Sequence, residues 1–188
     1  NLKSGRISSI DAVPYWSRPE LGLVAPERFM GLAEEAGVAD QITSWILRTA
    51  CEQNAAWQKA GYPSVRVTVR IDGQQFLDPG LAEKVENALR ETGVKPETLE
   101  LLVNEDAITS NLQDSGKKLM RIKTQGVELC VDDFSIQERS LKMVKELPVD
   151  RLILKRSLIM HVADDLEDRA IVTAVISLAH SLGLKVVA

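Results

Sequence analysis

The sequence predicts an α/β fold in which helices cover a parallel sheet, closed as a (β/α)8 barrel. Short strand-like segments alternate with longer segments of helical periodicity, as in parallel sheets with helical crossovers. No glycine-rich phosphate loop follows the early strands, which disfavours an open dinucleotide-binding sheet. Polar residues gather where strand segments end, which is where barrels place their chemistry.

The first half of the chain supplies the opening strands and helices. A strand is expected at residues 6–16, and helices are expected at 26–37 and 40–61. The segment 66–71 alternates apolar and polar residues, which indicates a strand. An amphipathic helix is expected at 79–93, where a glycine ends it.

The second half continues the alternation with four strands and three helices. Strands are expected at 99–103, 127–131, 151–154 and 185–187. Helices are expected at 116–126, 138–147 and 165–183.

Composition is that of an ordinary globular domain. The 188 residues are 45% hydrophobic and 27% charged, which is enough for one substantial core. The net charge of −4 gives no indication of a nucleic-acid polymer as partner. Cys51 and Cys130 lack metal-like spacing, so we expect reduced core thiols and a cytoplasmic location, although a longer parent protein could be membrane-tethered. The start at Asn1 suggests a piece of something longer.

The most informative feature is the pair Asp132-Asp133 at the end of an apolar strand. Strand alternation predicts that one carboxylate points inward and the other lies on the rim. Adjacent carboxylates repel unless a cation lies between them, which indicates a metal-assisted site. The alternative is a capped strand end with hydrated acids.

Four stretches of the sequence are similar to those of a known protein family. They are WSRPELGLVAPERFMGLAEEAG at 16–37, DDFS at 132–135, ELPVDRLILKRSL at 146–158 and AIVTAVISLAHSLGLKVVA at 170–188. With these stretches the chain resembles the EAL domains, bacterial phosphodiesterases that hydrolyse cyclic di-GMP with divalent metals. The resemblance implies a modified TIM-like (β/α)8 barrel of EAL type whose first strand and C-terminal part lie outside this chain. Residues 1–188 would then be a single partial domain of a multidomain signalling protein.

Part of the family's site is retained in this sequence. The name-giving triplet is Asp11-Ala12-Val13, so its first ligand is shortened but still acidic. The resemblance implies that Asp132 and Asp133 match the metal-binding pair and that Glu105 matches a supporting acid.

The other positions of the site are changed. Tyr15 replaces an arginine that holds phosphate, Arg70 replaces a metal-binding asparagine, Leu102 replaces a glutamate ligand, and Ile153 replaces the catalytic lysine. Leucine and arginine offer no lone pair to a metal, and isoleucine cannot orient water. We therefore expect no meaningful hydrolysis of cyclic di-GMP and no catalytic residues.

Arg70 suggests a specific hypothesis about the charge balance of the site. Its guanidinium is expected to enter the metal site and pair with Asp132, Asp11 or Glu105, with Lys155 as a second positive charge. The alternative is that Arg70 points to solvent. The remnant pocket thus comprises Asp11, Arg70, Glu105, Asp132 and Asp133, with no metal ligands assigned and no cofactor expected, although the family uses Mg²⁺ or Mn²⁺.

These observations predict an inactive EAL-like domain that acts as a regulatory or protein-interaction module in bacterial cyclic di-GMP signalling. Its expected partner is another protein or an adjacent signalling domain, and a homodimer and weak cyclic di-GMP binding are left open. The first alternative is a cyclic di-GMP receptor that does not hydrolyse its ligand. The second is an active phosphodiesterase with rearranged ligands.

Overall fold

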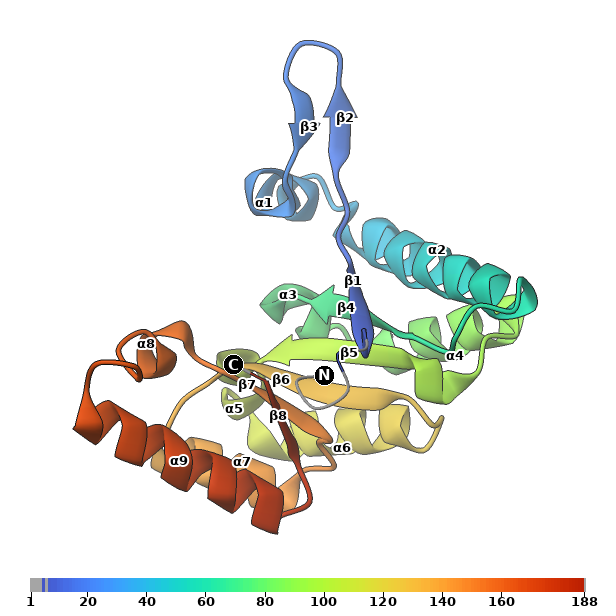
Figure 1. Cartoon of the computed structure of the whole chain (residues 1–188). Helices are drawn as coiled ribbons and strands as arrows, with labels where there is room; N and C mark the ends of the chain where they lie inside the picture. Colours follow the sequence, from blue (N-terminus) through green and yellow to red (C-terminus); the bar gives the residue numbers. More distant parts are fainter. Residues whose placement is uncertain (1–4, 6, 188) are drawn as a thin grey trace.

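A curled, six-stranded parallel sheet forms the centre of the molecule (Figure 1). The structure is a computed structural model that describes residue 5 and residues 7–187. The strand order is β1 (Ser9–Ala12), β4 (Arg66–Ile71), β5 (Leu99–Asn104), β6 (Glu128–Phe134), β7 (Arg151–Leu154) and β8 (Lys185–Val187). Every neighbouring pair runs parallel, which confirms the predicted α/β class.

Helices follow the strands in the expected alternation. The long ones are α1 (Pro26–Glu35), α2 (Ala39–Lys59), α4 (Leu81–Thr92), α6 (Leu112–Lys123), α7 (Glu138–Glu146) and α9 (Leu166–Ser181). The short ones are α3 (Gly73–Leu77), η1 (Pro96–Thr98), α5 (Glu105–Thr109) and α8 (Arg156–Ile159). Among the helices of the described residues, none is both long and apolar enough to cross a membrane.

Local sequence signals explain two of the helix ends. Gly93 ends α4 in the left-handed conformation at φ 64°, which glycine adopts without the steric cost that a Cβ imposes. The α6 helix begins one turn earlier than predicted, because the side chain of Asn111 accepts a hydrogen bond from the Asp114 N–H at 3.3 Å and caps it.

The predicted strand at 6–16 is wrong in its extent. Residue 6 lies outside the described residues, and the strand ends at Ala12. Pro14 interrupts the segment, because it offers no N–H to a sheet. The chain then forms a separate antiparallel hairpin of β2 (Trp16–Arg18) and β3 (Gly22–Val24), which projects away from the main sheet (Figure 1).

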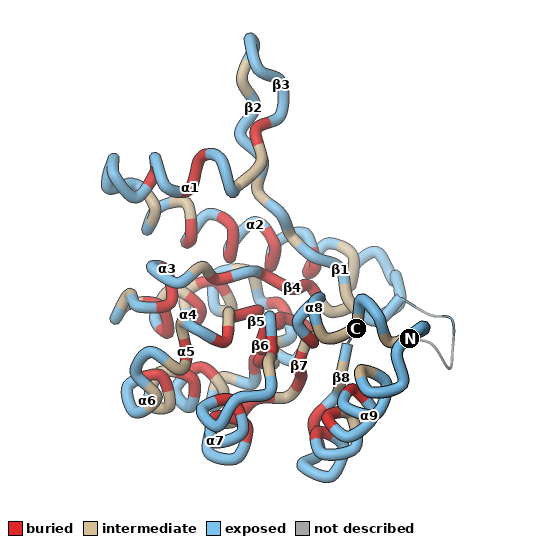
Figure 2. Tube along the Cα trace, turned by 90° about the vertical axis from the view of Figure 1, so that its left-hand side faces the viewer, coloured by how far each residue is buried: buried red, intermediate tan, exposed pale blue. Residues whose placement is uncertain are grey.

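The two faces of the sheet have different chemistry. One face is apolar and packs against the helices, and its buried residues gather in β4 to β7 (Figure 2). Residues such as Val69, Leu101 and Val131 on this face are at most 1% exposed. The concave face instead carries charged residues at both ends of the strands, with Thr68, Leu102 and Cys130 between them.

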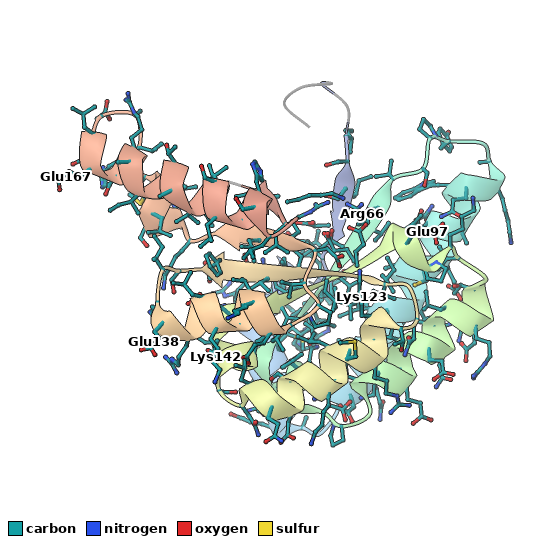
Figure 3. The ribbon with its side chains drawn as sticks, turned by 90° about the horizontal axis from the view of Figure 1, so that it is seen from below. Arg66, Glu97, Lys123, Glu138, Lys142 and Glu167 are labelled. Atoms are coloured by element: carbon teal, nitrogen blue, oxygen red, sulfur yellow. The ribbon has the colours of Figure 1, made fainter. Side chains whose placement is uncertain are left out.

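A buried ionic network lies on the concave face where the strands begin (Figure 3 labels Arg66). Arg66 on β4 pairs with Glu128 on β6 at 3.0 Å, and Arg151 on β7 approaches Glu100 on β5 at 3.4 Å. Glu100 is 2% exposed and also accepts a hydrogen bond from Thr68 at 2.8 Å. Four adjacent strands each contribute one charge, so each charge is neutralised inside the sheet rather than by water.

Both cysteines are free and buried, as expected of core thiols. Burial raises the pKa of the Cys51 thiol to about 11, and burial likewise raises the pKa of Cys130. Neither thiol is therefore a reactive thiolate near neutral pH.

Candidate functional site

The site lies on the concave face at the carboxyl ends of β4, β5 and β6. Arg70 faces Leu102 across the β4–β5 pairing, and Asn104 faces Asp132 across the β5–β6 pairing. The Arg70 side chain extends over β5, and its Nη1 donates to Oδ2 of Asp132 in a salt bridge. Leu102 lies on the intervening strand and is 3% exposed. Of the predicted partners of Arg70, Asp132 is the one that it contacts, although the Arg70 side chain remains 56% exposed.

The two aspartates behave as strand alternation predicts. Asp132 is buried at 8% exposure, whereas Asp133 is exposed on the rim. Asp133 adopts φ 56° where the β6–β7 register shifts, a conformation that non-glycine residues rarely adopt. The Nδ2 of Asn104 donates a hydrogen bond of 3.3 Å to the Oδ2 of Asp133. The Oδ1 of Asn104 accepts a hydrogen bond from the Asp106 N–H and so caps helix α5.

Glu105 holds the loop that follows the aspartates. Its carboxylate is 5% exposed and accepts hydrogen bonds from the Ser135 N–H at 2.7 Å and from the Ser135 hydroxyl at 2.9 Å. The hydroxyl of Ser140, which is fully buried in α7, donates to the other carboxylate oxygen. Glu105 therefore faces the β6–α7 connection, and the predicted alternative of an Arg70–Glu105 pair is wrong.

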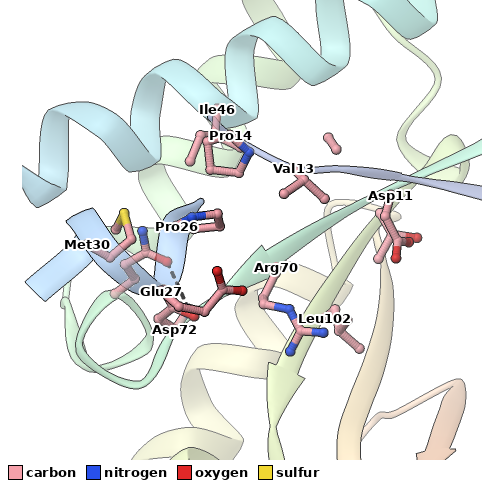
Figure 4. Close-up of a pocket in the computed structure, with 13 residues that line it drawn as sticks. Asp11, Val13, Pro14, Pro26, Glu27, Met30, Ile46, Arg70, Asp72 and Leu102 are labelled. Atoms are coloured by element: carbon pink, nitrogen blue, oxygen red, sulfur yellow. Dashed lines mark hydrogen bonds between the residues drawn. The ribbon is translucent and has the colours of Figure 1, made fainter. Parts of the chain in front are cut away.

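Asp11 lies apart from the other acids, on the edge strand β1. It is exposed and lines a pocket of about 450 Å³ together with Arg70 and Asp72 (Figure 4). The remaining lining includes the acid Glu27, the amide Gln75 and an apolar wall formed by Val13, Pro14, Pro26, Met30 and Ile46. The salt bridge of Arg70 is with Asp132, so Asp11 contributes charge at longer range.

The charges at this end of the sheet act on one another. Burial alone would lower the pKa of Arg70, but the hydrogen bond and charge of Asp132, with the charges of Asp72 and Asp11, raise that pKa above its usual value. Arg70 is thus a permanent cation. Burial raises the pKa of Asp72 and Glu27 raises it further, while Arg70 partly offsets both effects.

Several residues of this region were not predicted from the sequence. Asp72 and Gln75 are joined by a hydrogen bond of 2.8 Å from the Asp72 N–H to the Gln75 Oε1, part of a capping box that starts α3. This Asp-x-x-Gln spacing after a strand was a usable sequence signal. Lys155, expected as a second cation, is exposed on the rim, and no ion pair involves it within the described part of the chain.

The side chains of this site do not form a ligand set for a divalent metal. Over residue 5 and residues 7–187, no three His, Cys, Asp or Glu side chains come together in an arrangement that would hold a metal ion. Arg70 takes an oxygen of Asp132, Glu105 faces the serines, and Leu102 supplies no oxygen. In this arrangement the side chains do not fit the metal.

Comparisons with known proteins agree with the fold. The family model described as "EAL domain" matches residues 1–188. The cyclic di-GMP phosphodiesterase NbdA of Pseudomonas aeruginosa is 37% identical over 187 residues, which are 100% of this chain and 24% of that protein. The bifunctional diguanylate cyclase/cyclic di-GMP phosphodiesterase MucR of the same organism is 34% identical over 185 residues, 98% of this chain and 27% of that protein. This chain thus spans about a quarter of these relatives.

Solved structures show the same architecture. The structure titled "PaMucR Phosphodiesterase, c-di-GMP complex" superposes with a TM-score of 0.88 at 34% identity, covering 97% of this chain and 74% of that one. The EAL enzyme Bd1971, bound to cAMP and cyclic di-GMP, gives a TM-score of 0.86 at 22% identity, covering 99% and 51%. At that identity the second likeness shows the fold alone, a TIM-like barrel.

One expectation must be corrected in the light of these matches. The prediction that no cofactor is expected is wrong, because the whole chain matches a family whose phosphodiesterases use Mg²⁺ or Mn²⁺. The prediction rested on ligand positions taken one at a time, but this end of the sheet still carries the acids Asp11, Asp72, Glu105, Asp132 and Asp133.

Proposed function

This chain belongs to the EAL domain family, and from that premise we propose that it is a non-hydrolysing member that regulates cyclic di-GMP signalling through contact with another protein or domain. Phosphodiesterase relatives place the family in cyclic di-GMP signalling.

The observation that carries the proposal is the salt bridge between Arg70 and Asp132. A phosphodiesterase of this family needs that carboxylate to bind a metal ion, and here it is bound to a guanidinium. An arginine offers donors and no lone pair, so it cannot bind and activate a water as a metal does. Asp132 in this conformation supports a packed charge pair rather than a reactive centre.

Two further substitutions support the same conclusion. Leu102 lies buried beneath the Arg70 side chain, and the half-buried Ile153 stands where the family resemblance implies a catalytic lysine. Loss of one well-placed catalytic group commonly lowers a rate by ~10²–10⁴-fold, and such losses are not additive. Several losses in one site leave little hydrolysis.

The test is a hydrolysis assay on the whole protein with cyclic di-GMP and either Mg²⁺ or Mn²⁺. We expect the wild-type protein to turn over no faster than its Asp132→Asn variant, because the carboxylate is not used in chemistry. NbdA assayed in the same buffer serves as the positive control. Metal-dependent turnover that the Asp132→Asn variant loses would refute the proposal.

A receptor that binds cyclic di-GMP without hydrolysis is the second candidate. The observation in its favour is the pocket of about 450 Å³ beside Arg70, in a chain that is 34% identical to a solved complex with this ligand. The carboxylates of Asp11, Glu27 and Asp72 line the same pocket and oppose a doubly anionic ligand. Calorimetry on the whole protein with Mg²⁺ separates the two candidates, since micromolar or tighter binding favours the receptor.

A further inference from the structure

We propose that the domain binds its partner protein through an aromatic pocket between the β2–β3 hairpin, α1 and the start of α2, and that the partner places a basic, apolar peptide segment there. The inference rests on the proposed function, in which the domain acts through contact with another protein. The aromatic pocket has a volume of about 420 Å³ and an almost wholly apolar lining. Figure 1 shows the hairpin projecting from α1 and α2, away from the main sheet.

Half of the aromatic residues of this chain line the aromatic pocket. The sequence holds three Trp, two Tyr and three Phe, and four of these eight residues are Tyr15, Trp16, Phe29 and Trp45 of the pocket. Phe29 is buried, but Trp45 is 56% exposed, and Tyr15 and Trp16 are exposed as well. Tryptophan and tyrosine supply much of the binding energy at protein interfaces, because they bury a large apolar area and lose little conformational entropy. Such a group of exposed rings is typical of a docking surface.

Contacts within the domain fix the frame of the aromatic pocket. The Trp16 ring packs edge to face against Phe29, with ring centroids 6.3 Å apart. The Arg18 guanidinium lies over the Trp16 ring, 4.7 Å from its centroid. Val24 at the end of β3 joins Phe29 and Met30 of α1 in a small core of their own, separate from the main one. These contacts hold the hairpin on α1, so binding of a partner requires little further ordering of the pocket.

The charge around the aromatic pocket favours a basic partner. Residues 15–45 carry five acids and two arginines, a net charge of −3 in a chain whose total is −4. Glu34 and Glu35 are exposed on α1 beside lining residues of the pocket, and neither forms an ion pair with another described residue. Arg18 is already paired with Glu20 at 3.6 Å. The surface is therefore negative, and it attracts lysine or arginine side chains of a partner.

A lysine or arginine side chain matches both properties of this surface. Its alkyl stem packs against an apolar lining while its charged end reaches carboxylates at the rim. The Trp16 ring already accepts the Arg18 guanidinium on its face, and cation–π attraction at the other exposed rings acts in the same direction. Pro14 lines both the aromatic pocket and the pocket beside Arg70, so a partner docked here lies next to the altered site.

The test is fluorescence anisotropy of a labelled amphipathic peptide of leucine and lysine, titrated with the whole protein. We expect this peptide to bind at least about tenfold more tightly than the peptide in which glutamate replaces every lysine, because the rim of the pocket is acidic. The Trp45→Ala variant should bind the leucine–lysine peptide about tenfold more weakly than wild type. The matched control is Leu166→Ala, which removes an exposed apolar side chain from α9 and should change the affinity less than about twofold. Equal affinities for the two peptides, or for Trp45→Ala and wild type, would overturn the proposal.

Charge variants and the oligomeric state test the identity of the occupant. The double variant Glu34→Gln/Glu35→Gln should weaken binding of the leucine–lysine peptide about threefold, whereas Glu97→Gln/Glu138→Gln, which removes two exposed acids elsewhere, should not. A dimer of the wild-type protein in analytical ultracentrifugation that Trp45→Ala dissociates would identify a second copy as the occupant and overturn the basic partner. Thermal unfolding of each variant confirms that it is folded. Hydrolysis of cyclic di-GMP by wild type would refute the proposed function without changing the peptide affinities, whereas absence of peptide binding would overturn this inference alone.

Discussion

The Glu100→Ala variant is expected to lose about 3–5 kcal/mol of unfolding free energy, the range for a buried ionic group that loses one partner. Glu100 is 2% exposed and lies between two arginines, with Arg151 at 3.4 Å and Arg66 at 4.0 Å. Its removal leaves the buried Arg151 without its carboxylate, whereas Arg66 keeps Glu128 at 3.0 Å. The hydroxyl of Thr68 also loses its acceptor.

Urea denaturation followed by circular dichroism measures this loss. The matched control is Glu97→Ala, because Glu97 is exposed in the short helix that precedes the same strand (Figure 3), and we expect a change below about 0.5 kcal/mol. A Glu100→Ala loss below about 1 kcal/mol would show that water, rather than this carboxylate, neutralises the arginines.

The Glu105→Ala variant is expected to lose about 3 kcal/mol and to loosen the connection between β6 and α7. Three donors of Ser135 and Ser140 converge on this buried carboxylate, and hydrogen bonds to charged groups contribute about 1.5–3 kcal/mol each. The loss is smaller than their sum because the loop can turn its serines to water once the anchor is absent.

Hydrogen exchange locates this effect. Amides in residues 135–140 should exchange faster in the Glu105→Ala variant, while those of β4 and β5 stay protected. The control is Glu138→Ala, since Glu138 is exposed at the start of α7 and contributes only its interaction with the helix dipole. Unchanged exchange in 135–140 would contradict an anchoring role for Glu105.

Much of the fold could be predicted because its periodicities are strong. The alternation of β4 and the amphipathic pattern of α4 followed by Gly93 identified two elements nearly to the residue. The prediction missed the β2–β3 hairpin and the short helices α3, α5 and α8, and it misplaced two strand ends. Pro14 ended the first strand early, and β6 continues through the aspartate pair to Phe134, with Asp133 at φ 56°.

The parts of the site whose positions follow from strand register could be predicted from the sequence. Arg70 and Asp132 lie on the same face of the sheet, so their meeting follows from the parallel alignment of three strands. Strand register does not decide which of several nearby carboxylates the Arg70 side chain contacts. Glu105 instead accepts hydrogen bonds from serines of the β6–α7 loop, whose path no local sequence pattern specifies. The residues Asp72 and Glu27 escaped prediction: Asp72 directly follows β4 and caps α3, and Glu27 lies in the first turn of α1.

The four charges at the beginning of β4, β5, β6 and β7 also set how these strands align. Because side chains alternate between faces, a slip of β5 by one residue would turn Glu100 into the apolar layer beneath the helices and leave both arginines without it. A slip by one residue therefore leaves a buried carboxylate without partners, whereas in the native alignment Arg151 and Thr68 compensate the buried Glu100. The four charged side chains at the beginning of the strands thereby favour the register that brings Arg70 and Asp132 together at the opposite end of the sheet.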